Sequence, residues 1–334
     1  MRDGDILILK EDEVRSLLDG REAEIIRAVK AAYEAHGNGT DALPHSNFLR
    51  FPENDRDRII ALPAYLGGDF KVAGIKWVAS FPKNLERGLK RASAVIILNS
   101  VTTGRPMSIM EGAVISARRT AASAVLAAQH LSRRAGVTRA GVVGCGVVNF
   151  EVVRFLSACL PDIRSLLIFD NDQGRARQFE ENCRKTFPGL EVKIALNVRE
   201  VLAGCLLTSL ATTALRPHIS DLSDCPEGST ILHISLRDLS PEVILDCDNV
   251  ADDVDSVCSA QTSLHLAEQS AGNRDFIRCA LPDILRGSAP ARQEEGGVAV
   301  FSPFGLGTLD LALGKMVFDL ALRERRGLVL ESFC

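Results

Sequence analysis

Features that would place this 334-residue chain in a membrane or on nucleic acid are missing from its sequence. No apolar run reaches about 18 residues, so no membrane span is expected. The opening residues, MRDGDILILKEDEV, carry acids where a secretory signal would carry bases followed by a longer apolar run. The net charge is −4, and no basic stripe with interleaved aromatic residues occurs. We therefore expect a soluble, cytoplasmic protein that has neither a membrane nor a nucleic acid as its partner.

The chain also lacks the spacings that hold disulfide frameworks or metal ions. Its nine cysteines form no CxxC pair and are odd in number, which is typical of reduced, mostly buried thiols. Its six histidines show no HExxH or other ligand spacing, so no metal is expected. The remaining composition, 46% hydrophobic and 25% charged, is that of a globular protein with enough apolar material for two cores.

Strand-like segments separated by short turns dominate the first third of the chain. Apolar residues at helical spacing predict one helix over 22–36, which Gly37 and Gly39 end. Successive strands with short turns favour an antiparallel or mixed sheet, so residues 1 to about 115 are interpreted as an α+β module. The expected strands are DILIL (5–9), DRIIALP (57–63), FKVAGIKWVAS (70–80) and ASAVIILN (92–99).

A different pattern begins after Gly136, where short apolar runs alternate with helical stretches. That alternation is typical of a parallel sheet covered by helices on both faces, so the fold class is α/β with a Rossmann-type, doubly wound domain. Helices are also predicted over 111–133 and 308–325, and residues 286–297 are the best candidate for a linker or mobile loop. The apolar runs are 139–144, 165–170, 192–196, 205–210, 229–235 and 248–253.

One glycine-rich turn joins the first of these runs to a helix. The strand AGVVG continues into GCGVVN, which places Gly144 and Gly146 in the pattern G-x-G-x-x-N. In a dinucleotide site the first glycine makes a tight turn, the second lets a pyrophosphate approach the backbone, and the helix N-terminus supplies N–H groups. Asn149 replaces the third glycine, whose role is helix–strand packing more than phosphate contact. We therefore expect a dinucleotide to bind here.

An acidic residue supports this interpretation and selects the cofactor. The next strand, SLLIFD, ends in Asp170, which lies 21 residues after Asn149. A carboxylate there would accept hydrogen bonds from the adenosine ribose and repel a 2′-phosphate, which favours NAD over NADP. The alternative is an ordinary strand–turn–helix followed by an incidental surface aspartate.

Basic residues that could bind a substrate carboxylate are ambiguous when taken alone. Lys76 lies inside the apolar run VAGIKWVAS, where it either faces a polar cavity with a lowered pKa or lies on the solvent face of a strand. Arg118 and Arg119 point about 100° apart on a helix, so at most one would face a site, and two solvated arginines are the more common arrangement. Arg50 and Arg91 are similarly open.

Asp238 follows the apolar strand ILHISL, at the end where open α/β sheets bind their ligands. A carboxylate there could move a proton or activate water, but it could equally be a turn aspartate. His233 lies within the strand itself and is expected to be a hydrogen-bonded core histidine.

Together these residues resemble the ornithine cyclodeaminase/μ-crystallin family, and the resemblance covers nearly the whole chain. The order and spacing of the matching segments make it specific. The segments are RIIALPAYLGG (58–68), GIKWVAS (74–80), ASAVIILN with TGRPMSIMEG (92–112), RRTAASA (118–124), GVVGCGVVN (141–149), HISLRD (233–238) and FGLGTLDLA (304–312).

The resemblance implies roles for the ambiguous residues. Lys76 and Arg119 match the family's carboxylate-binding residues, and Arg50 and Arg91 would assist them. Asp238 matches the catalytic aspartate, and Lys76 is also expected to be catalytic. It also implies homodimers, and one discontinuous substrate-binding and dimerisation domain (1–125 plus 305–334) around a Rossmann domain (126–304). The implied NAD contacts are Gly144, Cys145, Gly146, Val147, Val148, Asp170, Thr208 and Thr212.

Within the family the chain resembles the N-(2-amino-2-carboxyethyl)-glutamate dehydrogenase branch, through RIIALPAYLGG, the RAS of 91–93 and GIKW. That branch forms 2,3-diaminopropionate for siderophores and peptide antibiotics. The implied activity is NAD-dependent oxidation at an amino-acid α-carbon, followed by imine hydrolysis to 2-oxoglutarate and 2,3-diaminopropionate. Ornithine cyclisation, alanine dehydrogenation and ketimine reduction remain open within the family. A non-catalytic, ligand-binding protein of the μ-crystallin type is the alternative of a different class.

Overall fold

The computed structural model describes residues 2–132 and 136–333, which form two compact units. The first unit joins Met1–Arg119 to Leu306–Cys334, and the second is Thr120–Gly305. The chain passes from the first to the second within one helix, α3 (Ala113–Leu131). Over the described residues, no helix is both long and apolar enough to cross a membrane.

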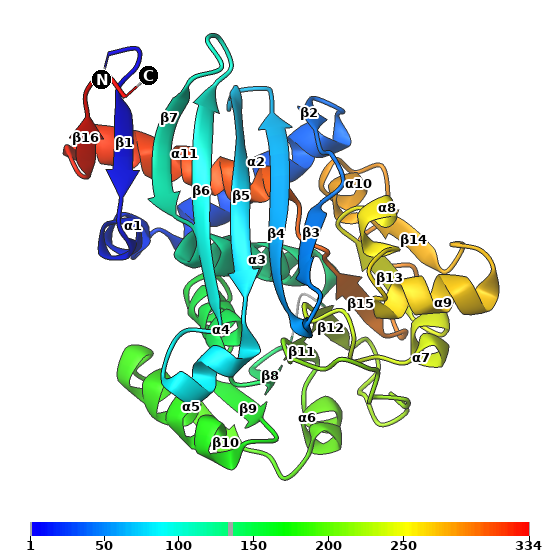
Figure 1. The fold of residues 1–334 in the computed structure, drawn as a ribbon. Coiled ribbons are helices and arrows are strands. Elements are labelled where there is room, and N and C mark those ends of the chain that lie inside the picture. The colour runs from blue at the N-terminus through cyan, green and yellow to red at the C-terminus, as the bar shows by residue number, and fades with distance from the viewer. Residues whose placement is uncertain (1, 133–135, 334) are drawn as a thin grey trace. The chain divides into compact units, whose positions relative to one another are not determined.

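A mixed sheet organises the first unit (Figure 1). Neighbouring strands from β4 to β7 are antiparallel, whereas β1 runs parallel to β7, so the predicted mixed sheet is confirmed. The predicted strands are present, but β2, β3, β7 and β16 were not anticipated from the sequence. In spatial order the strands are β16 (Leu328–Leu330), β1 (Ile6–Leu9), β7 (Pro106–Glu111), β6 (Ala92–Ser100), β5 (Val72–Ser80), β4 (Asn54–Leu66) and β2 (Asp41–Ala42), with β3 (Asn47–Phe51) also paired to β4.

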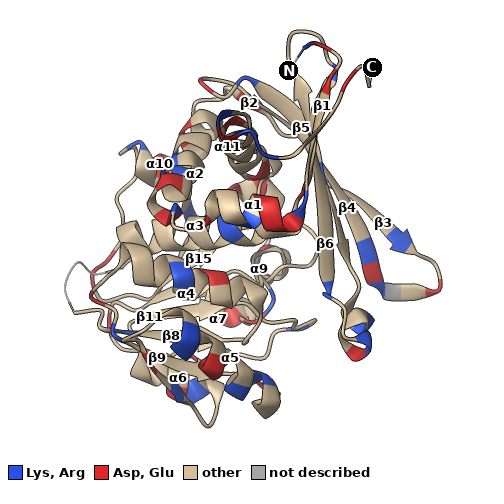
Figure 2. Ribbon diagram, turned by 90° about the vertical axis from the view of Figure 1, so that its left-hand side faces the viewer, with Lys and Arg blue, Asp and Glu red and all other residues tan. Residues whose placement is uncertain are grey.

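The described helices of this unit lie on one face of the sheet (Figure 1, Figure 2). Figure 1 shows α2 (Glu22–Gly37) and α11 (Gly307–Glu324) behind the strands, with α1 (Glu11–Leu18) near the end of β1. Burial alternates along the strands as a period of two requires: Ile96 and Leu98 on β6 are buried, and Ile97 between them is half-buried. A short 3₁₀ helix, η1 (Pro82–Arg87), joins β5 to β6.

An all-parallel, eight-stranded sheet forms the second unit, which confirms the predicted α/β fold class. The order of its first five strands is that of a doubly wound sheet, and the direction of winding reverses between β8 and β11. In spatial order the strands are β10 (Glu191–Ile194), β9 (Ser165–Phe169), β8 (Arg139–Val143), β11 (Leu207–Leu210), β12 (Thr230–His233), β15 (Ala299–Ser302), β13 (Asp248–Ala251) and β14 (Ile277–Ala280).

The two longest helices that lie wholly within the second unit follow its first two strands, β8 and β9. These two are α4 and α5, and Phe150 on α4 packs edge-on against Phe179 on α5 at 5.9 Å between ring centroids. The helices are α4 (Val147–Cys159), α5 (Gln173–Thr186), α6 (Val198–Gly204), α7 (Pro241–Leu245), α8 (Val254–Val257), α9 (Ser263–Ala271) and α10 (Leu281–Leu285).

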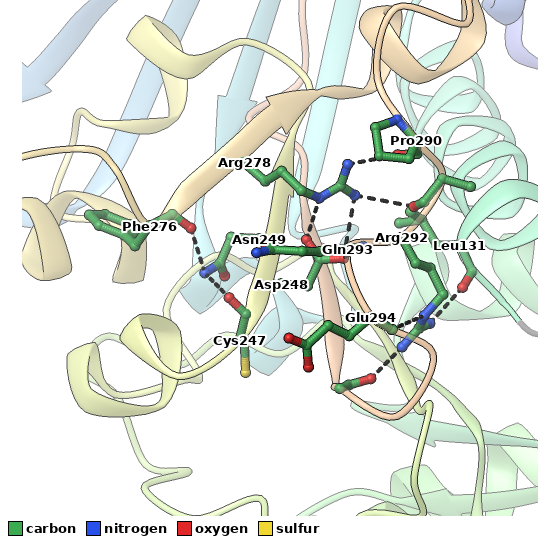
Figure 3. Close-up of polar contacts among 12 residues, drawn as sticks. Leu131, Cys247, Asp248, Asn249, Phe276, Arg278, Pro290, Arg292, Gln293 and Glu294 are labelled. Carbon is green, nitrogen blue, oxygen red and sulfur yellow. Dashed lines mark hydrogen bonds and ion pairs between the residues drawn. The ribbon is translucent and has the colours of Figure 1, made fainter.

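The segment 286–297 has no helix or strand, yet it is neither a linker between the units nor a free loop. It joins α10 to β15 within the second unit, and two arginines fasten it (Figure 3). Arg278 pairs with Asp248 and donates to the Pro290 carbonyl at 2.6 Å. Arg292 donates to the Leu131 carbonyl, also at 2.6 Å. The Arg278 guanidinium thus satisfies a carbonyl of this segment, and Arg292, which belongs to the segment, anchors it to the last residue of α3.

Candidate active site

The glycine turn of the second unit has the geometry that a dinucleotide requires. Gly144 has a φ of +91°, and a Cβ on it would lie 2.5 Å from the Ala211 carbonyl oxygen, so only glycine fits. A Cβ on Gly146 would meet no described atom within 4 Å. Gly146 and Val147 are exposed at the N-terminus of α4, where backbone N–H groups and the helix dipole favour an anion.

Asn149, the departure from the glycine fingerprint, proves to hold this turn together. Its side chain is fully buried, and its amide nitrogen donates to the Val143 carbonyl at 2.9 Å and to the Gly144 carbonyl at 2.7 Å. Its amide oxygen accepts the Ser209 hydroxyl at 2.6 Å. The side chain therefore does by hydrogen bonding what a third glycine does by close packing.

Asp170 follows β9 and is connected to the same turn. One carboxylate oxygen accepts the Cys145 N–H at 2.8 Å, and the other accepts the Asp172 N–H at 2.9 Å. The acid is half-buried at the carboxyl edge of the sheet, where the sequence places a ribose-binding carboxylate. Burial, followed by the charge of Asp170, raises the pKa of the Cys145 thiol to about 12, so Cys145 contributes through its backbone.

The two threonines that the resemblance implies as NAD contacts lie at different positions relative to β11. Thr208 lies in the interior of β11, 1% exposed and packed against Gly141 of β8. Thr212 follows β11 at the carboxyl edge of the sheet and lies next to the glycine turn. A Cβ added to Gly144 would be 3.2 Å from the Thr212 Cα. Its hydroxyl accepts the Ala214 N–H at 3.1 Å and donates to Asp238 at 2.5 Å.

Asp238 is therefore not an ordinary turn aspartate, because it is fully buried at the centre of a polar cluster. Besides Thr212, its carboxylate contacts the Ser235 hydroxyl and His218 Nε2, the latter at 3.0 Å. The predicted core histidine, His233, is also fully buried and lies 3.2 Å from the Ser302 hydroxyl through Nδ1. Burial alone would raise the pKa of Asp238, but His233 and the two hydroxyl groups hold it well below its usual range.

In the first unit, Lys76 lies on the helix-covered face of the sheet rather than on the solvent face. It occupies one row with Leu62, Ile96 and Met110, all buried. Its ammonium pairs with Asp310 at 2.6 Å. It also donates to the Ser116 hydroxyl at 3.2 Å.

Asp310 on α11 was not anticipated from the sequence, and it also pairs with Arg119 at 2.9 Å. Two buried cations thus share one fully buried carboxylate, which leaves a net positive charge. Burial, followed by the charge of Arg119, lowers the pKa of Lys76 to about 8 against the opposing effect of Asp310. Such a cluster can attract a carboxylate ligand.

The adjacent arginines diverge as helix geometry requires, but neither is solvated. Arg118 is 1% exposed and pairs with Asp19, whereas Arg119 is 7% exposed and pairs with Asp310. The prediction of two solvated arginines, which is the more common arrangement, is therefore wrong for this helix. Arg91 precedes β6 with a half-buried side chain, and its carbonyl accepts the Phe81 N–H at 2.8 Å.

Arg50 has an unexpected cationic neighbour, Arg58, directly opposite it in the β3–β4 ladder. Blue segments mark basic residues on both strands in Figure 2. The alternation along β4 places the two arginines on the same face of the sheet as Lys76, about 13 Å along the strand from its row. No ion pair joins either of them to a described side chain. Like charges directly opposite one another are destabilising unless an anion binds between them.

The fold and the glycine turn define the chain as a Rossmann-type dinucleotide-binding protein. It belongs to the ornithine cyclodeaminase/mu-crystallin family, whose sequence profile matches residues 6–325, so the resemblance seen in the sequence is confirmed. It is 26% identical to N-((2S)-2-amino-2-carboxyethyl)-L-glutamate dehydrogenase of Staphylococcus aureus, over 98% of this chain and 99% of that protein.

Two solved structures share the fold over nearly their full length. One is Delta(1)-pyrroline-2-carboxylate reductase of Thermococcus litoralis in complex with NADH and L-proline, with a TM-score of 0.90, 25% identity, and coverage of 96% of this chain and 99% of that chain. The other is an archaeal alanine dehydrogenase dimer with bound NAD, with a TM-score of 0.87, 25% identity, and coverage of 98% and 99%.

We predict that an added methyl group lowers the stability of the fold at Gly144 but lowers the affinity for NAD at Gly146. Gly144→Ala should destabilise the fold by about 1–3 kcal/mol, because its φ is positive and its Cβ meets a carbonyl oxygen. Gly146→Ala should leave the melting temperature unchanged but weaken NAD binding at least about tenfold, or about 1.4 kcal/mol, by occupying the space of a pyrophosphate. Thermal melts and calorimetric titration with NAD would measure both. Equal melting temperatures for the two variants would contradict this account of the turn.

The lowered pKa of Lys76 predicts that substrate binding weakens as the pH rises through about 8. Above that value the amine is neutral and no longer attracts a carboxylate, so KM should increase more than kcat decreases. Lys76→Arg, which remains charged, should show no such increase. The unfolding free energy should rise with pH from about 8 to the ordinary lysine value of 10.5, because only the unfolded state keeps the proton there. A flat KM profile for the unsubstituted protein would refute the assignment.

Proposed function

We propose that this chain is an NAD-dependent oxidoreductase that acts on the CH–NH bond at an amino-acid α-carbon. Family membership and the glycine turn support the class of reaction. The two nearly full-length structural neighbours, one with NADH and one with NAD, support the cofactor.

The described residues fit NAD. The glycine turn and the N-terminus of α4, from Cys145 to Val148, would hold the pyrophosphate, and Gly146 leaves the space for it. Asp170 would accept hydrogen bonds from the ribose hydroxyls through lone pairs that the Cys145 and Asp172 N–H groups do not use. Its negative charge would repel a 2′-phosphate. When bound, the nicotinamide accepts or donates the hydride.

The substrate that we propose is N-(2-amino-2-carboxyethyl)-L-glutamate, which yields 2-oxoglutarate and L-2,3-diaminopropionate. The observation that carries this choice is the presence of two separate cationic clusters on one face of the first unit's sheet. One is the Lys76–Arg119 pair on Asp310, and the other is the Arg50–Arg58 pair without a described counterion. A substrate with three carboxylates uses both clusters, whereas alanine or ornithine has a single carboxylate for them.

In this mechanism the protein's residues bind carboxylates and move protons. Lys76, Arg50, Arg91 and Arg119 hold the substrate, and their positive field disfavours a protonated amine, so the nitrogen is neutral before the hydride leaves. The amine loses a hydride from carbon and a proton from nitrogen, which gives an imine. Water adds to the imine, and the adduct collapses to a ketone and a primary amine. The Asp238 cluster manages these protons.

Ornithine cyclisation, alanine dehydrogenation and ketimine reduction are the alternative reactions, and all use hydride transfer at an amino-acid α-carbon. A binding protein without catalysis, as in the μ-crystallin branch, is disfavoured because Lys76, Arg119 and Asp238 are all present and in polar clusters.

We further propose a homodimer that forms through the open face of the first unit's sheet, with 1–125 plus 305–334 as the substrate-binding and dimerisation domain and 126–304 as the NAD domain. Trp77 and Val95, cross-strand partners on that face, are 41% and 38% exposed. The adjacent row formed by Ile75, Ile97 and Ile109 is also apolar. A contiguous apolar sheet face of this kind is typical of a protein interface.

A substrate panel tests the proposed reaction. Purified protein with NAD⁺ should form NADH, followed by absorbance, and 2-oxoglutarate from N-(2-amino-2-carboxyethyl)-L-glutamate, but not from L-alanine, L-ornithine or L-proline. NADH from one of the others alone would identify an alternative reaction of the family. No NADH from the proposed compound would refute it as the substrate.

Arg58→Gln should raise the KM for the tricarboxylate about tenfold to a hundredfold, because one charge-assisted contact of about 1.5–3 kcal/mol is lost. The matched control is Arg56→Gln, which removes an exposed arginine two residues earlier on β4 and should change KM less than about twofold. Equal effects of the two substitutions would show that Arg58 has no specific role. The melting temperature of each variant would verify that the sheet is intact.

A further inference from the structure

The environment of Asp238 suits a permanently ionised carboxylate rather than a group that exchanges protons. Oδ1 accepts from the Thr212 hydroxyl at 2.5 Å and lies 3.0 Å from His218 Nε2, and Oδ2 contacts the Ser235 hydroxyl. The side chain has no exposed area. A carboxylate that is already surrounded by donors has little basicity left and no open path to a substrate.

His218 has the opposite properties. Its side chain is 40% exposed, and it lies in the segment that follows β11, at the carboxyl edge of the parallel sheet. Nε2 faces Asp238, whereas Nδ1 has no partner among the described residues. The segment is also held by its backbone, because the His218 and Ile219 N–H groups both donate to the Asp238 carbonyl at 2.9 Å.

The hydrogen bond between these side chains determines which ring nitrogen is basic. An ionised carboxylate can only accept, so Nε2 of His218 must carry the hydrogen that it shares with Asp238. In the neutral ring Nδ1 then bears the lone pair, on the side of the imidazole away from the carboxylate. Asp238 thereby fixes the tautomer and would stabilise the imidazolium that forms on protonation, as in other histidine–carboxylate pairs.

We propose that His218 is the group that exchanges protons with the substrate and that Asp238 is a positioning residue which orients it. This rests on the oxidative reaction proposed above. As the hydride leaves the α-carbon for the nicotinamide, the amine nitrogen gives its proton to Nδ1 and the C=N bond forms. The imidazolium returns this proton to the imine nitrogen, and the neutral ring then accepts a proton from the water that attacks the carbon. It passes that proton to the nitrogen as the C–N bond breaks. The carbinolamine hydroxyl loses its proton to solvent as the C=O bond forms, so the ring ends neutral and one proton is released.

The charged groups around the imidazole are few. Asp238 faces it directly, and His233 contacts the same carboxylate from the buried side, with its Nε2 3.5 Å from Oδ2. Arg216 and Asp221 lie on the same chain segment as His218. A change in the pH profile on replacing His218 alone, with these four retained, therefore reports on the imidazole itself.

Kinetics across the interval in which imidazoles titrate, about pH 5 to 8, provide the first test. His218→Gln should lower kcat/KM by about 10²- to 10⁴-fold and remove the acidic limb of the profile. Added imidazole should restore activity to His218→Ala but not to Asp238→Asn. The matched control is His36→Gln, because His36 also contacts a carboxylate, that of Asp41, at 2.8 Å, yet lies in the other unit. The control should retain full activity and the acidic limb.

Nitrogen NMR of the labelled protein without cofactor or substrate provides a second test that does not depend on activity. The resonance pair that disappears in His218→Gln should show the neutral ring with hydrogen on Nε2 and none on Nδ1. In Asp238→Asn this tautomer should no longer be enforced. Hydrogen on Nδ1 in the unsubstituted protein would overturn the proposal, because the exposed nitrogen would then not be a base.

The two tests separate failure of this inference from failure of the proposed function. If the unsubstituted protein oxidises the substrate and His218→Gln retains both its rate and its acidic limb, His218 is not the proton carrier although the reaction is right. If no NADH forms with the unsubstituted protein, the proposed substrate is refuted, and the tautomer still decides the arrangement of His218 and Asp238.

Discussion

The carboxylate of Asp310 is the contact on which the first unit depends. It brings together β5, α3 and α11, which carry Lys76, Arg119 and Asp310, and it joins residues 191 positions apart in the chain. Burying three charges is costly, and each is tolerable only while its partners remain. Removing the acid would leave two adjacent cations in the core. The same arrangement supports the proposed function, because two cations on one acid leave a surplus positive charge that could attract a substrate carboxylate.

A buried side chain also holds the glycine turn of the second unit in place, but it does so through hydrogen bonds between neutral groups. The amide of Asn149 accepts from the strand-borne Ser209 and donates to carbonyls of the glycine turn, so the turn is already formed before a pyrophosphate arrives. The Gly144 turn then abuts the segment that carries Thr212, whose hydroxyl reaches Asp238. In the proposed mechanism, phosphate binding and proton transfer would therefore use adjoining parts of one sheet edge, which would reduce the reorganisation needed during reaction.

Local patterns in the sequence predicted the fold class, most strands and the position of the glycine turn, because these depend on periodicity and on backbone conformation. Partnerships between distant residues were not predictable in this way. Asp310 did leave a signal, an acid between Leu309 and Leu311 on an apolar helix, which mirrors the isolated Lys76. His218 left none, because its segment is irregular and is placed by contacts with Asp238 and Leu239, which lie about 20 residues later in the chain. The roles assigned to Asp238 and the carboxylate-binding residues remain predictions.

The discontinuity of the first unit also bears on how the chain folds during synthesis. All of the second unit, Thr120–Gly305, is synthesised before α11 and β16. Until then Lys76 and Arg119 have no Asp310, and β1 lacks the antiparallel neighbour that pairs Ile6 with Leu330. The second unit can complete its sheet first, while the earlier-made strands wait with an uncovered apolar face. Residues from Leu306 onward thus complete a unit whose other residues were translated much earlier, and until they are made its strands have an unpaired edge, a feature that favours aggregation.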